Sequence, residues 1–137
     1  MTNKERDGLF RVCVDGKRGD EGTVYTRRTR EPFAFADLGD LMLKVERVLE
    51  QQDYPQASQE MRSFRPGART ARRGDLPVDG LSQEAVEGAR GEKATFDLQI
   101  TSRRNATWQG ILRWSDGTTS RFENDLAFLS LVTERLK

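Results

Sequence analysis

Histidine is absent from this chain of 137 residues, and cysteine occurs only once, as Cys13. The absence of histidine removes the commonest general base and metal ligand, and it excludes Ser-His and Cys-His nucleophile pairs. A single cysteine excludes an intramolecular disulfide and a metal site built from several cysteines. We therefore expect a protein that is not an enzyme, has no catalytic residues, and binds neither a metal ion nor a cofactor.

The chain also lacks long hydrophobic runs and an excess of charge of one sign. Hydrophobic residues make up 35% of it and charged residues 33%, and no stretch approaches the length needed to span a membrane. Residues 1–8 are polar, unlike the apolar centre of a signal peptide. The 23 basic and 22 acidic residues nearly cancel, so bulk charge does not indicate nucleic-acid binding. We expect a cytoplasmic protein without a membrane contact.

Hydrophobic periodicity predicts strands followed by a helix near the N-terminus. Residues 9–14 alternate between apolar and polar side chains, which is typical of a strand with one buried face. Residues 23–30 predict a second strand whose arginines face solvent at least in part, and residues 33–35 predict a short third strand. Asp37 is a suitable N-cap for an amphipathic helix over residues 38–49.

The same order of elements recurs near the C-terminus. Alternation predicts a strand over residues 94–101 and a turn at 102–106. A hairpin over residues 108–122 follows, with Asp116-Gly117 as its turn. Asn124 predicts the N-cap of a final amphipathic helix.

Corresponding residues of the two stretches are separated by 86–88 positions. They are Phe10, Val12, Val14, Gly22, Phe35, Asp37, Leu41 and Val45 in the first stretch, and Phe96, Leu98, Ile100, Gly110, Phe122, Asn124, Phe128 and Val132 in the second. We predict an α+β fold of two tandem ββ(β)α repeats, with an antiparallel sheet and two packed helices related by a pseudo-two-fold axis. The alternative is that two unrelated ββα segments share this general pattern.

The predicted repeats divide the chain into three segments. Residues 1–52 form the first repeat and residues 94–137 the second, and both are expected to share one compact domain because one copy is too small to bury a stable core. The intervening residues 53–93 are rich in arginine, glycine and proline. We predict an irregular linker there, partly disordered or draped over the surface, with one short helix over residues 82–89.

A short motif lies at the start of the hairpin in the second repeat. Its residues are Asn105, Trp108, Gln109 and Gly110, followed by Trp114 and Phe122. This pattern resembles small uncharacterised bacterial proteins with an Asn-x-x-Trp-Gln-Gly strand motif followed by a helix. The resemblance covers the second repeat only, ends where Glu123 follows Phe122, and implies no known activity.

Arginines and aromatic residues are the candidates for binding. They are Tyr25, Arg27, Arg28, Arg30, Arg103, Arg104, Trp108, Arg113 and Arg121. An exposed Trp108 would stack a base, a sugar or a partner side chain, and the alternative is that it packs beneath the helices. The arginines would form a phosphate-binding surface if they converged on one sheet face, and a solvated polar face if carboxylates paired with them.

Three functions follow from these patterns. The first is a non-catalytic accessory protein that presents a sheet face or edge to a protein partner or to a second copy of itself. The second is a nucleic-acid-binding protein that uses the sheet-face arginines and an arginine-rich arm at residues 62–73. The third is a subunit of a larger assembly in which residues 62–93 become ordered on the partner. Convergence of the arginines would favour nucleic acid, whereas pairing with carboxylates would favour a protein partner.

Overall fold

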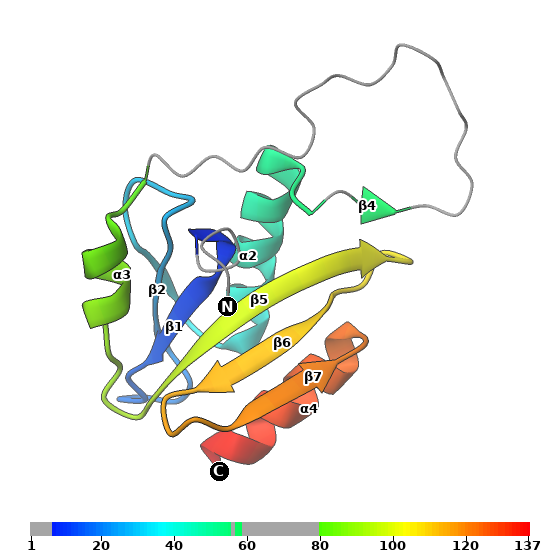
Figure 1. Ribbon diagram of the computed structural model, residues 1–137. Helices are drawn as coiled ribbons and strands as arrows, with labels where there is room; N and C mark the ends of the chain where they lie inside the picture. Colours follow the sequence, from blue (N-terminus) through cyan, green and yellow to red (C-terminus); the bar gives the residue numbers. More distant parts are fainter. Residues whose placement is uncertain (1–6, 56, 59–79) are drawn as a thin grey trace, which may run out of the picture.

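A computed structural model of the chain describes residues 7–55, 57–58 and 80–137 (Figure 1). One sheet with the strand order β3-β2-β1-β5-β6-β7 has antiparallel neighbours throughout. Its strands are β1 (Phe10–Val14), β2 (Gly22–Tyr25), β3 (Phe33–Phe35), β5 (Ala94–Arg104), β6 (Gln109–Trp114) and β7 (Thr119–Phe122). The short β4 (Ala57–Ser58) pairs in parallel with the end of β5. The helices are α2 (Leu38–Gln52), α3 (Gln83–Gly88) and α4 (Asp125–Leu136). The predicted α+β class with an antiparallel sheet is confirmed.

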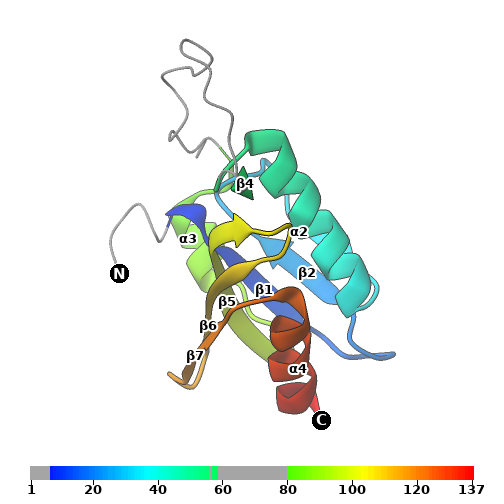
Figure 2. The ribbon, with the colours of Figure 1, turned by 90° about the vertical axis from the view of Figure 1, so that its right-hand side faces the viewer.

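Helices cover the two faces of the sheet unequally. Figure 2 shows α2 and α4 on one side of the sheet and α3 on the other. The face beneath α2 and α4 is apolar because alternate strand residues point to it. The buried residues that form this core include Phe10, Val12, Val14, Val24, Phe96, Leu98 and Leu112 from the strands, and Leu41, Val45, Leu49, Phe128 and Val132 from the helices. We call the opposite side of the sheet, which carries α3, the open face.

Both long helices begin at the residues that the sequence predicts. The Asp37 carboxylate accepts a hydrogen bond from the backbone N–H of Asp40 at 2.8 Å. The Asn124 side chain accepts one from the backbone N–H of Ala127 at 2.7 Å. Each bond satisfies one of the backbone donors that a helix leaves unpaired at its start. The predicted N-caps of α2 and α4 are therefore confirmed.

The predicted second strand, residues 23–30, is wrong beyond Tyr25. The hydroxyl of Thr26 donates a hydrogen bond to the carbonyl oxygen of Leu9 at 2.9 Å. The backbone N–H of Thr29 donates to the carbonyl oxygen of Thr26 at 3.5 Å. The Thr26 hydroxyl also accepts a hydrogen bond from the backbone N–H of Arg28 at 3.2 Å. The chain therefore turns where the β-branched composition predicted a continuing strand, since this local side-chain bond competes with the ladder.

The predicted turn at residues 102–106 is shorter than expected, because β5 continues to Arg104. The side chain of Gln109 accepts hydrogen bonds from the Ser102 hydroxyl at 2.6 Å and from the backbone N–H of Arg104 at 2.8 Å. These bonds extend the pairing past a register shift between Ile100 and Ser102. The turn itself is formed by residues 105 and 106, both with positive φ.

Residues 80–93 lie against the sheet. Ser82 caps α3 by accepting a hydrogen bond from the backbone N–H of Ala85 at 3.1 Å, and Val86 is buried. The short helix predicted over 82–89 is therefore present. The predicted arginine-rich arm, residues 62–73, lies within 59–79, outside the described residues. Within the described residues, no helix is both long and apolar enough to cross a membrane.

Candidate interaction site

A row of polar side chains crosses the open face from β2 to β7. The pairing registers place five residues directly opposite one another in succession: Tyr25, Arg11, Asp97, Arg113 and Thr119. Residues directly opposite each other in a sheet point to the same face. Their neighbours along each strand, such as Val12 and Phe96, point into the core. The row therefore lies on the side opposite α2 and α4.

A second row lies beside the first on β5, β6 and β7. It consists of Gln99, Ile111 and Arg121, which are successive partners in the register. Ile111 is half-buried and Arg121 is exposed. Among the described residues, Arg121 makes no hydrogen bond or ion pair, and no helix covers this part of the face (Figure 1).

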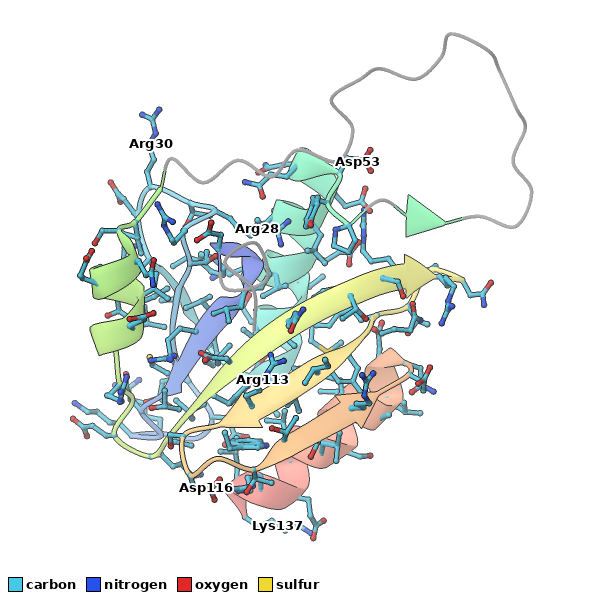
Figure 3. The ribbon with its side chains drawn as sticks, viewed as in Figure 1. Arg28, Arg30, Asp53, Arg113, Asp116 and Lys137 are labelled. Atoms are coloured by element: carbon cyan, nitrogen blue, oxygen red, sulfur yellow. The ribbon has the colours of Figure 1, made fainter. Side chains whose placement is uncertain are left out.

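Arg113 of the first row is held by a neutral partner, Gln99 of the second row. Its guanidinium donates a hydrogen bond from Nη1 to Oε1 of Gln99 at 2.8 Å. No carboxylate of the described residues forms an ion pair with it. Figure 3 shows Arg113 on the sheet face, near the middle of the molecule. A guanidinium with free donors on an uncovered face is suited to bind an anion.

Arg11 belongs to the same row but its donors are used internally. It forms a two-point ion pair with Asp97, in which Nη2 lies 3.1 Å from Oδ2. Its Nη1 also donates to the carbonyl oxygens of Glu87 at 3.0 Å and Ala89 at 3.3 Å. The hydrogen bond to Asp97 raises the pKa of Arg11 above its usual range, although burial opposes the shift. Arg11 thus attaches the end of α3 to the sheet.

Two cavities lie on the open face next to this ion pair. The first has a volume of about 290 Å³ and lies where β5 and β6 meet the loop after α3. The second, of about 540 Å³, lies between α3 and the strands. Both are lined by Arg11, Arg90 and Asp97, so they adjoin.

The arginines predicted near β2 differ in their surroundings. Arg27 forms an ion pair with Asp7 at 2.8 Å, and Arg30 is exposed. Arg28 is only 4% exposed, so the part of this stretch that faces solvent does not include Arg28. Its guanidinium donates to Oε1 of Gln52 at 2.8 Å and to the carbonyl oxygens of Gly8 and Tyr54. Burial lowers the pKa of Arg28 to about 10, which leaves it protonated at neutral pH.

Arg103 is also buried, at 4% exposed, and lies on the α2 side of the sheet. Its guanidinium lies 2.9 Å from Glu50 and 3.3 Å from Glu46, and its Nε donates to the carbonyl oxygen of Pro55 at 2.8 Å. The register shift between Ile100 and Ser102 explains why Arg103 points to the α2 side. One extra residue in β5 turns the side chains that follow it to the other face of the sheet. Arg104, the next residue, is exposed.

The predicted arginines consequently do not form one surface. Arg28 and Arg103 have internal partners, and Arg27 is paired with a carboxylate. Figure 3 shows Arg30 at one end of the molecule, far from Arg113. The structure brings Arg113 and Arg121 together on neighbouring strands, with Tyr25 at the far end of the first row.

Trp108 does not provide an exposed platform. It is 2% exposed, and its ring meets that of Phe128 edge-on with centroids 5.5 Å apart. Its indole Nε1 donates a hydrogen bond to Oε1 of Glu46 at 2.7 Å. Trp108 therefore packs beneath the helices, which was the alternative to an exposed ring. Trp114 is buried as well, and its ring centroid lies 4.7 Å from that of Phe96.

Sequence reasoning missed Arg11, Asp97 and Arg90 as members of the site. Alternation along β1 had placed Arg11 on the polar side of its strand. The pairing of this strand with the strand over residues 94–101 was not predicted, so the ion pair with Asp97 was not expected. Arg90 lies in the loop after α3, where periodicity says nothing about side-chain position.

Comparisons with known proteins found no similar protein. No protein-family model, no curated protein and no solved structure matches this chain. Within the described residues, no group of three or more His, Cys, Asp or Glu side chains is placed to hold a metal ion. The chemistry available on the open face is anion binding by guanidinium groups, beside the half-buried side chain of Ile111.

Proposed function

We propose that this protein is a non-catalytic interaction module that binds a protein partner on the open face of β5, β6 and β7. The observation that carries the proposal is the position of Arg113. Its guanidinium is anchored by the neutral amide of Gln99 at 2.8 Å, on a part of the sheet that no described helix covers. A charged group that is oriented but not neutralised is ready for an acidic group of a partner.

The composition of this part of the face favours a protein as the partner. Ile111 is half-buried at its centre, and the polar residues Gln99, Thr119 and Arg121 surround it. An apolar centre with a polar rim is the usual anatomy of a protein–protein interface, and arginine is enriched there.

The surroundings of the other arginines weaken the nucleic-acid hypothesis. Binding a phosphate backbone requires several unpaired cations along one path, whereas Arg27 is paired with Asp7 and Arg103 with Glu50. Single-strand binding also uses exposed aromatic rings, and Trp108 is buried. Nucleic acid is therefore the second candidate.

Site-specific photo-cross-linking tests the proposed surface. A photoreactive amino acid is introduced at Ile111 or Thr119 on the open face, and at Leu43 or Thr133 on the helices as matched controls. Adducts with one protein, formed from both open-face positions and lost on adding Arg113→Glu, are expected. The adduct mass separates a foreign partner from a second copy of the chain. Adducts from the helix positions alone would contradict the proposal.

Titration with single- and double-stranded RNA and DNA at two salt concentrations tests the second candidate. We expect no salt-dependent binding that is weakened by substituting Arg113 or Arg121. Binding that weakens steeply with salt, and that is lost in Arg113→Gln, would replace the protein-partner proposal.

We also propose that residues 1–52 and 94–137 are two copies of one repeat within one domain, with residues 53–93 as the connection. The register of β1 with β5 supports this. Arg11 lies opposite Asp97, the residue 86 positions later, and Val12 lies opposite Phe96 as Phe10 lies opposite Leu98. A pseudo-two-fold axis between Arg11 and Asp97 would produce this pairing. Hydrogen exchange tests the shared domain: amides of β1 and β5 should become exchangeable with the same opening free energy. Values that differ by more than about 2 kcal/mol would contradict it.

A further inference from the structure

The smaller cavity on the open face has a fixed floor and two available cations. The floor is the ion pair of Arg11 with Asp97, in which Nη2 and Oδ2 lie 3.1 Å apart. Arg11 also donates to the carbonyl oxygens of Glu87 and Ala89. With its donors used in this way, Arg11 shapes the cavity rather than binding a ligand.

Arg90 and Arg113 line the cavity from different elements. Arg90 lies in the loop after α3, and its Nη1 donates to the carbonyl oxygens of Glu87 at 2.7 Å and Ala89 at 2.8 Å. Arg113 lies on β6, and its Nη1 donates to Gln99 at 2.8 Å. Each guanidinium is thus oriented by neutral oxygens through one nitrogen. Within the described residues, neither has an ion pair with a carboxylate.

The charges and size of the cavity indicate what it can hold. Arg11 and Asp97 offset each other, so Arg90 and Arg113 leave the lining with an excess of positive charge. A volume of about 290 Å³ accommodates a carboxylate group with the side chain that carries it. Planar guanidiniums bind the two oxygens of a carboxylate with several donors at once.

We propose that this cavity is a recognition site for a carboxylate, an aspartate or glutamate side chain in an acidic segment of the protein partner, bound between Arg90 and Arg113. The inference rests on the proposed function and specifies the chemistry of its partner. The adjoining cavity of about 540 Å³ gives the rest of the segment a path along α3.

Titration with a blocked hexaglutamate peptide tests the carboxylate site, with blocked hexaglutamine as the control probe. The readout is the amide resonances of isotope-labelled protein at low salt. We expect hexaglutamate alone to shift the resonances of residues 90, 95–97 and 113–115. Arg90→Gln and Arg113→Gln should each weaken binding by about tenfold. Arg47→Gln removes an exposed charge on α2, on the other side of the sheet, and should leave the affinity unchanged.

The outcomes separate this inference from the proposed function. Equal affinity of the wild type and both arginine variants, or shifts confined to other residues, would overturn the carboxylate site. Cross-links from positions 111 and 119 would, in that case, continue to support the proposed function. Arg90→Gln alters an exposed loop side chain, so its folded state is expected to persist even if Arg113→Gln unfolds. A single-stranded DNA oligomer that binds the same residues more tightly than hexaglutamate would overturn both proposals.

Discussion

Gly110 lies directly opposite Phe122 in the pairing of β6 with β7, and the Phe122 ring occupies the space where a side chain of Gly110 would be. A Cβ atom at Gly110 would lie 2.8 Å from Cζ of Phe122 and 2.2 Å from the carbonyl oxygen of Gln99. Gly22 has the same relationship with Phe35, at 2.8 Å, and its Cβ would lie 2.0 Å from the carbonyl oxygen of Cys13. Glycine at these two positions lets a phenylalanine of the neighbouring strand cover the backbone.

Alanine at either glycine should therefore destabilise the protein. The added Cβ would collide with a backbone carbonyl that belongs to the sheet and cannot move freely. We expect Gly22→Ala and Gly110→Ala each to lower the free energy of unfolding by about 2–4 kcal/mol. Urea denaturation followed by circular dichroism measures the change.

Gly39 provides the matched control for these substitutions. It lies inside α2 with its nearest obstacle 3.5 Å away, and alanine is the better helix former. Gly39→Ala should raise the free energy of unfolding by about 0.5–1 kcal/mol. Unchanged stability in Gly110→Ala would contradict the close packing of Gly110 against Phe122 and the Gln99 carbonyl. Loss of stability in Gly39→Ala would mean that the control does not behave as an unobstructed helix position.

Arg103 should matter for stability far more than its neighbour Arg104. Arg103→Met would leave the carbonyl oxygen of Pro55 without its donor and would remove the ion pairs with Glu46 and Glu50. These two carboxylates are 41% and 63% exposed, so water can solvate them and the loss is moderate. We expect Arg103→Met to lower the free energy of unfolding by about 1–3 kcal/mol.

Arg104→Met is the corresponding control on the exposed side of the hairpin, and it should change stability by less than about 0.5 kcal/mol. Thermal unfolding of both variants at equal concentration gives the comparison. Equal midpoints would show that the buried guanidinium of Arg103 contributes nothing that a methionine does not.

Much of the fold could be predicted because its signals are local. The alternation around Val12 and Leu98 identified strands with one buried face. Asp37 and Asn124 identified the helix starts, because a capping side chain bonds the backbone three residues away. Each of these signals lies within a few residues of the structure it predicts, so no knowledge of the partner strand was needed.

The candidate site was harder to predict because it depends on contacts between distant segments. Arg11 and Asp97 meet only through the register of β1 with β5. The inward position of Arg103 depends on a register shift, and that of Arg28 on partners supplied by the end of α2 and the residues after it. Counting arginines by strand position therefore named Arg113 and Arg121 correctly as sheet residues, but it could not separate them from the buried ones.

Trp108 should act as a connection between α2 and α4. Its ring contacts Phe128 of α4, and its Nε1 donates to Glu46 of α2 at 2.7 Å. Trp108→Phe would remove the hydrogen bond and part of the ring. We expect a loss of about 2–3 kcal/mol in the free energy of unfolding. Glu46→Ala removes the acceptor of the indole, so a double-mutant cycle of Glu46→Ala with Trp108→Phe isolates the bond. Additive losses would show that the bond contributes no stability.

Cys13 should make stability fall at alkaline pH. Its side chain is 2% exposed, and burial raises the pKa of its thiol from an ordinary value of 9.0 to about 11. The folded state therefore keeps the proton that the unfolded state loses between these values. The corresponding stability is fully present below pH 9 and disappears as the pH rises through about 11. We expect the free energy of unfolding of the wild type, minus that of Cys13→Ala, to decrease by about 2–3 kcal/mol over this interval. Subtracting the variant removes the contributions of lysine and tyrosine, which titrate in the same range. A difference that stays constant from pH 8 to 11 would mean that the thiolate is tolerated in the folded sheet.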